Sequence, residues 1–301
     1  MIYTVTVNPS LDYIMRLKEF NPDAVNRTYE DAIMAGGKGI NVSIMLQHLG
    51  HSNTALGFVA GFTGQEIIRQ LREEGCAEDF IKLASGNSRI NVKLKSTTET
   101  EINAQGPHIS EADLAKLYTQ LDTLSPGDTL ILSGSIPNTL PNTMYKDIMA
   151  RLAGRQIRII VDATQDLLLN VLVHKPFLIK PNNHELAAML NTTFQTTEDI
   201  VAGARELQAR GAQNVLVSLA GDGAILLDET GMVHKRGVPK GTVVNSVGAG
   251  DSMVAGFLAG YLETNGDYQK ALSMGIAAGS ASAFNEWLAT REQVESLLVK
   301  E

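Results

Sequence analysis

Residues 248–251 combine residue types and a spacing that are suited to chemistry on a phosphate group. Gly248-Ala249-Gly250 precedes an apolar helical pattern, and Asp251 falls in the first turn of the expected helix. Free amides at a helix N-terminus attract anions, and glycine lets an anion approach the backbone closely. A carboxylate beside such a site can orient a hydroxyl and take its proton as that hydroxyl attacks phosphorus. The alternative is a tight turn whose acid complements the helix dipole.

A second glycine-rich turn spans residues 35–42, which read Ala-Gly-Gly-Lys-Gly-Ile-Asn-Val, and it also opens a helical pattern. The backbone amides after Gly37 and the Lys38 ammonium suit an anionic substrate. Asn41 can form hydrogen bonds with sugar hydroxyls. A glycine hinge beside a solvated lysine explains the same residues equally well.

Lys180, Asn182 and Glu185 follow an apolar strand expected over 177–180. Asn182 and Glu185 are three positions apart, which places them on one face of a helix. Their oxygens suit Mg²⁺, held directly or through water. Taken alone, the pair is better explained as a helix cap with a capping-box pattern.

Two further turns fall at expected strand ends. The segment 218–224, Ser-Leu-Ala-Gly-Asp-Gly-Ala, contains an Asp-Gly pair that is typical of a hairpin. Its functional interpretation is a nucleotide-binding turn that uses Ser218, Gly221, Asp222 and Gly223. Ser135, in the turn after the strand expected over 128–132, is a candidate substrate contact.

The elements that must position these turns alternate between strand-like and helix-like runs. We expect an α/β fold with a mostly parallel central sheet, helices on both faces, and ligands beyond the carboxyl ends of the strands. The expected strands are 2–7, 54–59, 128–132, 157–161, 177–180 and 213–218, and the expected helices are 39–49, 64–74, 110–122, 141–152, 183–190, 197–209, 249–263 and 267–284.

Two regions interrupt this alternation, residues 11–35 and 88–105, which carry short, polar-rich strands. Such strands do not suit a buried parallel sheet, and we expect a small, partly exposed β-sheet lid over the site. Because exposed sheet edges invite pairing, a homodimer through this lid is expected. Residues 1–301 are otherwise expected to form a single domain.

Composition excludes several classes of partner. The formal net charge is −8 and no long Lys/Arg run occurs, which argues against nucleic acid and anionic membrane surfaces as partners. Cys76 is the single cysteine, so no intrachain disulfide can form and a reducing, cytoplasmic compartment is expected. We expect no signal peptide, and no apolar run is long enough to span a bilayer.

The motifs together resemble the ribokinase/PfkB family of carbohydrate kinases. The resemblance rests on residues 35–42 running on to 57–64, on Lys180-Pro181-Asn182 with Glu185, and on the 248–251 turn, which occur in the family's order across essentially the whole chain. Residues 4–13, 26–28, 88–95 and 99–103 are similar to the bacterial branch that acts on fructose 1-phosphate.

The resemblance implies transfer of the ATP γ-phosphoryl group to the 6-hydroxyl of fructose 1-phosphate, with Mg²⁺ as a cofactor. It also implies a role for each matching residue. Asp251 would be the catalytic base, Gly248, Ala249 and Gly250 the anion hole, Asp12, Gly37, Lys38 and Asn41 the sugar contacts, Arg27 and Arg89 lid contacts to the substrate phosphate, Asn182 and Glu185 the Mg²⁺-linked pair, and Lys180, Ser218, Gly221 and Gly223 the nucleotide contacts.

The chain departs from the family pattern in two places. Asn245-Ser246 stand where many members have Asp-Thr, which argues against a monovalent-cation site, and Ala220 stands where glycine is common. Three alternatives remain: a tagatose-6-phosphate kinase, a nucleoside kinase, and a non-catalytic sugar-phosphate sensor. A neutral nucleoside would leave Lys38, Arg27 and Arg89 without an anionic partner, and the retained Asp251 disfavours a sensor.

Overall fold

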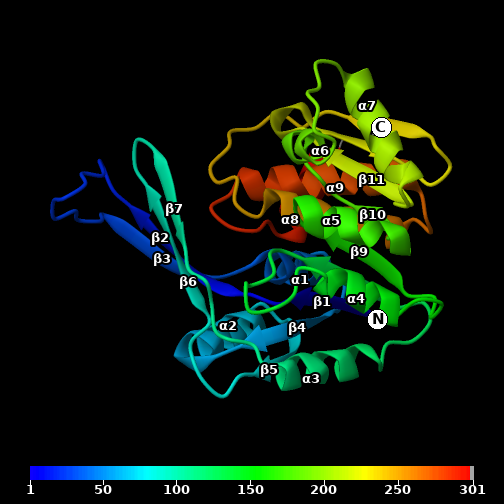
Figure 1. Ribbon diagram of the computed structural model, residues 1–301. Coiled ribbons are helices and arrows are strands. Elements are labelled where there is room, and N and C mark those ends of the chain that lie inside the picture. Colours follow the sequence, from blue (N-terminus) through cyan, green and yellow to red (C-terminus); the bar gives the residue numbers. More distant parts are fainter. Residues whose placement is uncertain (299–301) are drawn as a thin grey trace.

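A nine-stranded sheet forms the centre of the molecule in the computed structural model, which describes residues 1–298 (Figure 1). Pairing is parallel from β5 through to β11 and antiparallel for β12 and β13, so the expected mostly parallel sheet is confirmed. The strands, in spatial order, are β13 (Val233–Arg236), β12 (Ala224–Leu227), β11 (Asn214–Ser218), β10 (Leu178–Ile179), β9 (Arg158–Asp162), β8 (Thr129–Ser133), β1 (Ile2–Thr6), β4 (Thr54–Val59) and β5 (Ala77–Lys82).

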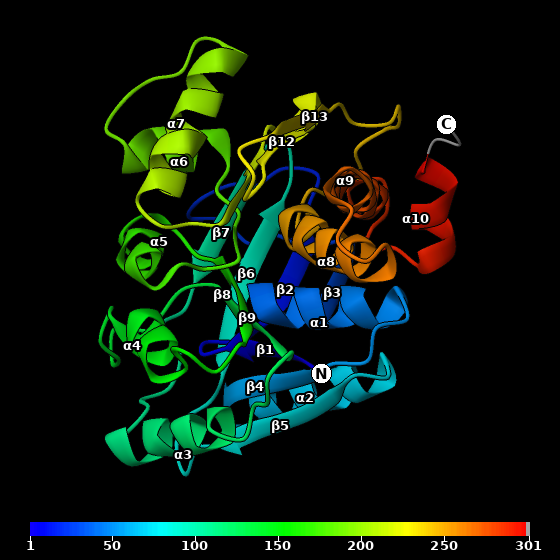
Figure 2. The same cartoon turned by 90° about the vertical axis from the view of Figure 1, so that its right-hand side faces the viewer.

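Helices cover both faces of this sheet (Figure 2). One face carries α1 (Lys38–His48), α2 (Gly61–Glu73), α8 (Ala249–Glu263), α9 (Tyr268–Ala283) and α10 (Arg291–Leu297). The other carries α3 (Glu111–Leu121), α4 (Met144–Arg151), α5 (Gln165–Val171), α6 (Asn183–Met189) and α7 (Thr197–Ala209). Each face has its own buried apolar cluster, because the central strands are apolar on both sides. Within residues 1–298, no helix is both long and apolar enough to cross a membrane.

Helices α8 and α9 pack closely through small residues, and this fixes where α8 begins. A Cβ atom on Gly256 would lie 2.6 Å from the Ala278 Cβ, and one on Gly260 would lie 2.8 Å from the Met274 Cβ. All residues from Asp251 to Gly260 are buried. The start of α8, with Asp251 in its first turn, is therefore held by the core rather than by a loop.

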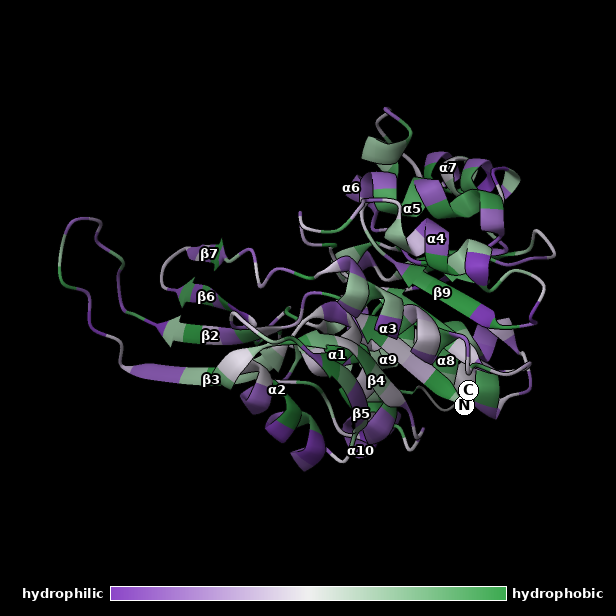
Figure 3. Ribbon diagram, turned by 60° about the horizontal axis from the view of Figure 1, so that its bottom comes forward, coloured by the Kyte–Doolittle hydropathy of each residue, from purple (hydrophilic) through white to green (hydrophobic). Residues whose placement is uncertain are grey.

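A second, four-stranded sheet projects from the main body (Figures 1 and 3). Its spatial order is β3 (Glu30–Gly36), β2 (Ser10–Arg16), β6 (Arg89–Lys95) and β7 (Glu99–Asn103), and we call it the small sheet. Strand β2 pairs antiparallel with β3 and parallel with β6. These strands come from the two polar-rich regions that interrupt the α/β alternation.

The two faces of the small sheet differ in chemistry. Asp12 is in register with Asn91 on β6, and successive residues of a strand point to opposite faces. The face of Asp12 therefore also carries Arg89, Lys93 and Lys95. The opposite face carries a cross-strand row of apolar and aromatic side chains, Ile33, Tyr13, Val92 and Ile102.

Several elements were not predicted from the sequence. Strand β5 lies at the edge of the large sheet, and only two adjacent residues in it, Phe80 and Ile81, are buried, so it does not form an apolar run. Strand β13 and the short helices α5 and α10 were also missed, and β12 was expected only as the second strand of the hairpin at 218–224. Helix α2 begins at Gly61 rather than at the expected residue 64, since Ala60 is the extended N-cap residue.

Candidate active site

Both glycine-rich turns meet at the carboxyl edge of the large sheet. Asn41, in the first turn of α1, donates a hydrogen bond from Nδ2 to Asp251 Oδ2 over 2.7 Å. Asp251 is only 7% exposed. Two segments 210 residues apart in sequence thus contribute one hydrogen-bonded pair, which the sequence predicted only as two separate motifs.

The turn before Asp251 leaves backbone donors available. Gly248 is the N-cap of α8 with φ +79°, a conformation that favours glycine. Among the described residues, the amides of Gly250 and Asp251 have no hydrogen-bond acceptor. A Cβ atom on Gly250 would lie 3.4 Å from Lys180 Nζ, so the lysine ammonium lies beside the turn. The combination suits an anion.

Asp162, at the end of β9, is the central residue that the sequence analysis missed. It is fully buried, and its Oδ1 atom lies 3.1 Å from Lys38 Nζ and 3.4 Å from Lys180 Nζ. Within residues 1–298, its Oδ2 atom has no hydrogen-bond partner. One signal could have found it: an acid directly after Ile159-Ile160-Val161, at the carboxyl end of a buried strand.

The charges of this cluster set the protonation of its acids. Burial raises the pKa of Asp251 to about 6, and the neighbouring Asp162 carboxylate adds to the rise. Burial would also raise the pKa of Asp162, but Lys180 and Lys38 hold it below its usual value. Burial opposes the charge of Lys38, whose pKa is nevertheless raised by Asp162 and Asp251. Asp251 is therefore the acid that titrates nearest to neutral pH, as a general base requires.

Unpartnered polar atoms surround this cluster. A buried polar atom without a hydrogen bond costs free energy, so such atoms mark where water or a ligand binds. Ser133 ends β8, and its hydroxyl is one of them; Ser135 follows in the exposed turn beside Lys38. Within the described part of the chain, the unpartnered atoms here are Thr6 Oγ1, Asn8 Oδ1, Asn41 Oδ1, Asn91 Oδ1, Ser133 Oγ and Asp162 Oδ2.

The small sheet places Asp12 in a network of donors. Asp12 Oδ1 accepts hydrogen bonds from Ser10 Oγ at 2.7 Å and Asn91 Nδ2 at 3.1 Å, and Lys93 Nζ lies 3.0 Å from Oδ2. Gly36 is required beside it, since a Cβ atom there would lie 2.6 Å from Asp12 Cγ. Lys93 was not predicted as a site residue. Lys93 is two positions after Asn91 on β6, and this spacing is the signal that places both residues on the same face.

The two predicted arginines lie in different environments. Arg89, on the face of Asp12, donates from Nε to the Asn8 carbonyl over 3.0 Å, and burial lowers its pKa against the opposing effect of Asp12. Arg27 lies exposed in the connection between β2 and β3, which extends beyond the strand tips (Figure 3). Among the described residues, Arg27 forms no hydrogen bond or ion pair with another candidate residue.

Asn182 and Glu185 form a complete capping box at the start of α6. Asn182 Oδ1 accepts from the Glu185 amide and Glu185 Oε2 accepts from the Asn182 amide, each over 2.8 Å. The helix-cap interpretation is thus confirmed. Within residues 1–298, no group of three His, Cys, Asp or Glu side chains is arranged to hold a metal ion. A role for this pair with Mg²⁺ stays a prediction.

The 218–224 segment is the hairpin that the Asp-Gly pair predicts, with β11 and β12 antiparallel. Ser218 donates its amide to the Pro181 carbonyl over 3.1 Å, which joins it to the segment of Lys180. Gly223 has φ +96°, and a Cβ there would lie 2.0 Å from the Arg236 carbonyl oxygen, so the backbone itself requires this glycine. Gly221 and Asp222 are exposed in the single 3₁₀ turn η2 (Ala220–Asp222).

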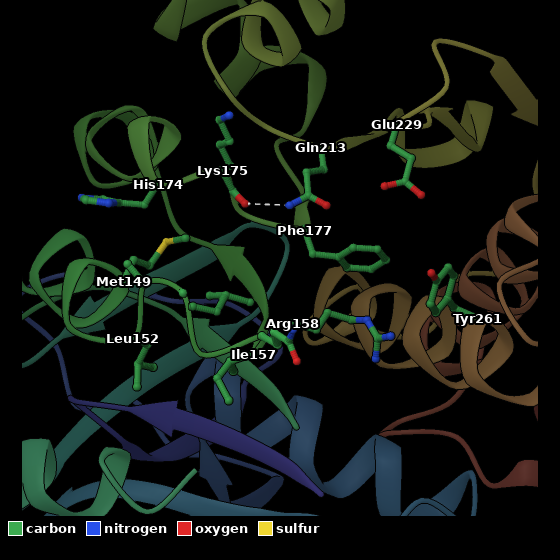
Figure 4. Close-up of a pocket in the computed structure, with 14 residues that line it drawn as sticks. Met149, Leu152, Ile157, Arg158, His174, Lys175, Phe177, Gln213, Glu229 and Tyr261 are labelled. Atoms are coloured by element: carbon green, nitrogen blue, oxygen red, sulfur yellow. Dashed lines mark hydrogen bonds between the residues drawn. The ribbon is translucent and has the colours of Figure 1, made fainter. Parts of the chain in front are cut away.

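A surface pocket lies away from the candidate site residues. A pocket of about 550 Å³ lies at the amino ends of β9, β10 and β11, where Arg158 is placed between the rings of Phe177 and Tyr261 (Figure 4). The guanidinium carbon is 5.2 Å and 5.1 Å from the two ring centres. None of the candidate site residues lines this pocket, and ligands of parallel sheets bind at the opposite edge. The active site is therefore assigned to the candidate residues at the carboxyl edge of the sheet and not to this pocket.

Residues 6–290 match the model of the pfkB family of carbohydrate kinases. The chain is 46% identical over 298 residues to the 1-phosphofructokinase of Bacillus subtilis (99% of this chain, 97% of the relative). It is 41% identical over 289 residues to the D-tagatose-1-phosphate kinase of Bacillus licheniformis (96% and 94%). Phosphofructokinase-2 from Escherichia coli, solved in complex with substrates and products, superposes with a TM-score of 0.93 at 28% identity (99% and 98%).

The electrostatic coupling of Asp162 to Asp251 predicts a pH shift. We expect kcat/KM to rise with pH as Asp251 loses its proton near pH 6. Asp162→Asn removes a negative charge that raises the Asp251 pKa, so the acidic limb should move to lower pH. Profiles of kcat/KM against pH for the parent and the variant measure this. An unchanged or upward-shifted limb would contradict the assignment.

Proposed function

We propose that this chain, which belongs to the pfkB family of carbohydrate kinases, transfers the γ-phosphoryl group of ATP to the 6-hydroxyl of fructose 1-phosphate. The products are fructose 1,6-bisphosphate and ADP. One observation carries the proposal: Asp251 is held by Asn41 beside two unpaired amides and the Lys180 ammonium. A base, an anion site and a cation thus converge where a phosphoryl group and a hydroxyl must meet.

We infer from the names of two relatives which carbon of the substrate carries the phosphate. The relatives from B. subtilis and B. licheniformis are both named for ketohexose 1-phosphates. A phosphate on C1 leaves the C6 hydroxyl free for attack. The second candidate substrate is therefore tagatose 1-phosphate, which differs from fructose 1-phosphate only in the configuration at C4. Tagatose 6-phosphate, the alternative drawn from the sequence, stays a prediction.

In the proposed reaction, Asp251 orients the 6-hydroxyl and accepts its proton. The bond between that oxygen and the γ-phosphorus forms as the bond from the γ-phosphorus to the β,γ-bridging oxygen breaks, and ADP leaves. The amides of Gly250 and Asp251 hold the transferring group's oxygens. Lys38 and Lys180 add positive charge, and Asp162 keeps both ammonium groups in place.

Mg²⁺ fits two oxygen atoms that the fold leaves unused. Asp162 Oδ2 is buried and has no partner in the part of the chain that the structure describes, and the Asn182–Glu185 cap uses only one carboxylate oxygen of Glu185. Hard carboxylate oxygens are suited to this ion, which usually binds through one or two carboxylates together with substrate phosphates. Bound there with ATP, it would neutralise phosphate charge.

The small sheet is the proposed support for the sugar phosphate. Asp12 would hold sugar hydroxyls, together with Gly37, Asn41 and Ser135. Arg89 and the more distant Arg27 would approach the substrate's phosphate. Ser218, Gly221, Asp222 and Gly223 would contact the nucleotide. The support for this division is that the small sheet and β11, which leads into the hairpin, lie on opposite sides of the molecule (Figure 1).

A test of the proposed function is ADP release with MgATP and a panel of acceptors. We expect fructose 1-phosphate to give the highest kcat/KM, ahead of tagatose 1-phosphate, fructose 6-phosphate, tagatose 6-phosphate and unphosphorylated sugars. In the same panel, Asp251→Asn should lose about 10²- to 10⁴-fold in kcat, since it cannot accept the proton. A different best acceptor would contradict the substrate assignment, and an active Asp251→Asn would contradict the base.

A measurement of unfolding distinguishes loss of the catalytic base in Asp251→Asn from loss of the folded structure. Because burial raises the pKa of Asp251 to about 6, its ionised form destabilises the folded state at pH 8 by about 3 kcal/mol. This penalty disappears below about pH 4, where the carboxyl is protonated in both states. Asp251→Asn should therefore unfold at higher denaturant than the parent at pH 8, with little gain at pH 4.

Arg89 should act on the sugar phosphate rather than on ATP. Removing a charge-assisted hydrogen bond costs about 1.5–3 kcal/mol, or roughly 10- to 100-fold. We expect Arg89→Ala to raise KM for fructose 1-phosphate by that factor and KM for ATP less than threefold. Arg69→Ala, on the exposed surface of α2, is the control. Equal effects on both substrates would exclude the assignment.

We also propose that the apolar face of the small sheet pairs two copies of this chain. Ile33 is 49% and Ile102 58% exposed, although both belong to the row that contains Tyr13 and Val92. Exposed apolar rows of this kind mark interaction surfaces. A second copy fits because the same row would complement itself across a two-fold axis.

Sedimentation velocity tests the pairing. We expect the parent to sediment as a dimer at micromolar concentration and Ile33→Glu/Ile102→Glu to sediment as a monomer, since two buried carboxylates would face each other. Val173→Glu, at a position 65% exposed elsewhere on the surface, should leave the dimer intact. A monomeric parent, or a dimer that persists in the double variant, would refute this interface.

A further inference from the structure

Lys95 joins the small sheet to the segment that leads into the anion-binding turn. It is the last residue of β6, and its Nζ atom donates a hydrogen bond to Asn245 Oδ1 over 2.9 Å. Its side chain is only 13% exposed although it carries a charge. Within residues 1–298, the carboxylate that forms an ion pair with Lys95 is Glu99, which lies 3.6 Å away and is itself 67% exposed. The amide oxygen of Asn245 is thus the closer and better-buried partner.

Asn245 is itself fixed on several sides. Its backbone amide donates to the Ala283 carbonyl at 3.1 Å, and its Nδ2 donates to the Glu286 carbonyl at 2.9 Å. Its Oδ1 also accepts from the Val247 amide at 3.3 Å, and Val247 immediately precedes Gly248. The orientation of the Asn245 side-chain amide therefore helps to fix the backbone of Val247, which leads into the turn.

The other cations on this face of β6 have different partners. Arg89 donates to the Asn8 carbonyl, and Lys93 pairs with Asp12, which belongs to the same sheet. Lys95 alone among these three reaches the segment before α8. It therefore links the sheet that carries the proposed sugar contacts with the turn that carries the proposed phosphoryl contacts.

We propose that Lys95 is a positioning residue that holds the 245–250 turn in register with the small sheet, so that the acceptor hydroxyl and the phosphoryl group are aligned. This inference rests on the proposed function. Its physical basis is that a misplacement of about 1 Å between reacting groups can cost roughly 10²-fold in rate. Substrate affinity depends on other residues and should change much less.

Kinetics of Lys95 variants test the alignment. Lys95→Met keeps the aliphatic stem and removes the donor, and it should lower kcat at least tenfold with KM for ATP within twofold of the parent. Lys95→Arg should recover most of the lost kcat, since it restores a charged donor. Asn245→Leu should lower kcat similarly, and the double variant Lys95→Met/Asn245→Leu should be no slower than Asn245→Leu alone. Lys146→Met, exposed on α4, is the matched control.

Hydrogen–deuterium exchange separates this proposal from the proposed function. Amides of residues 245–250 should exchange several-fold faster in Lys95→Met than in the parent or in Lys146→Met, with or without turnover. Unchanged exchange, or additive losses of kcat in the double variant, would overturn the positioning role. A parent that fails to phosphorylate fructose 1-phosphate would overturn the substrate assignment alone, and the kinetic comparison would then use the best acceptor of the panel.

Discussion

The buried ion cluster around Asp162 is the constraint on which the site depends. Burying charges is costly unless each is paired, and removing one partner leaves an uncompensated charge. Two lysines and one aspartate leave a local charge of +1, which the ionised Asp251 balances. An entering phosphate is attracted by the two lysine ammonium groups. Its negative charge also favours the protonated form of Asp251. Lys38 lies in α1, Asp162 ends β9, and Lys180 directly follows β10, so the cluster exists only when the sheet is correctly ordered.

The small sheet serves two purposes because the residues of a strand alternate between its faces. On β6, Arg89, Asn91, Lys93 and Lys95 share the polar face, whereas Val92 belongs to the apolar row. A shift of one residue in register would exchange these faces and remove the polar contacts from the site. The seven paired positions between β2 and β3 stabilise the observed register against such a shift.

Much of the fold could be read from the sequence because its cause is local. The βα alternation, the capping box at Asn182 and the hairpin at 218–224 depend on neighbouring residues. Asp251 was found because glycines and a helix start surround it. Asp162 was missed since a single acid after an apolar strand belongs to no motif, and its importance comes from lysines supplied by other elements. Similarly, Lys95 and Asn245 lie 150 positions apart, and only the tertiary structure brings them together.

The unpartnered polar atoms at the carboxyl edge make the folded state sensitive to metabolite supply. A ligand that supplies their missing hydrogen bonds binds the native state and not the unfolded chain. At a hundredfold excess over its Kd, such a ligand adds about 2.7 kcal/mol of stability. Proteases that capture opened molecules would then find far fewer of them. Cells that import the sugar should therefore retain more of this protein, without any change in its synthesis.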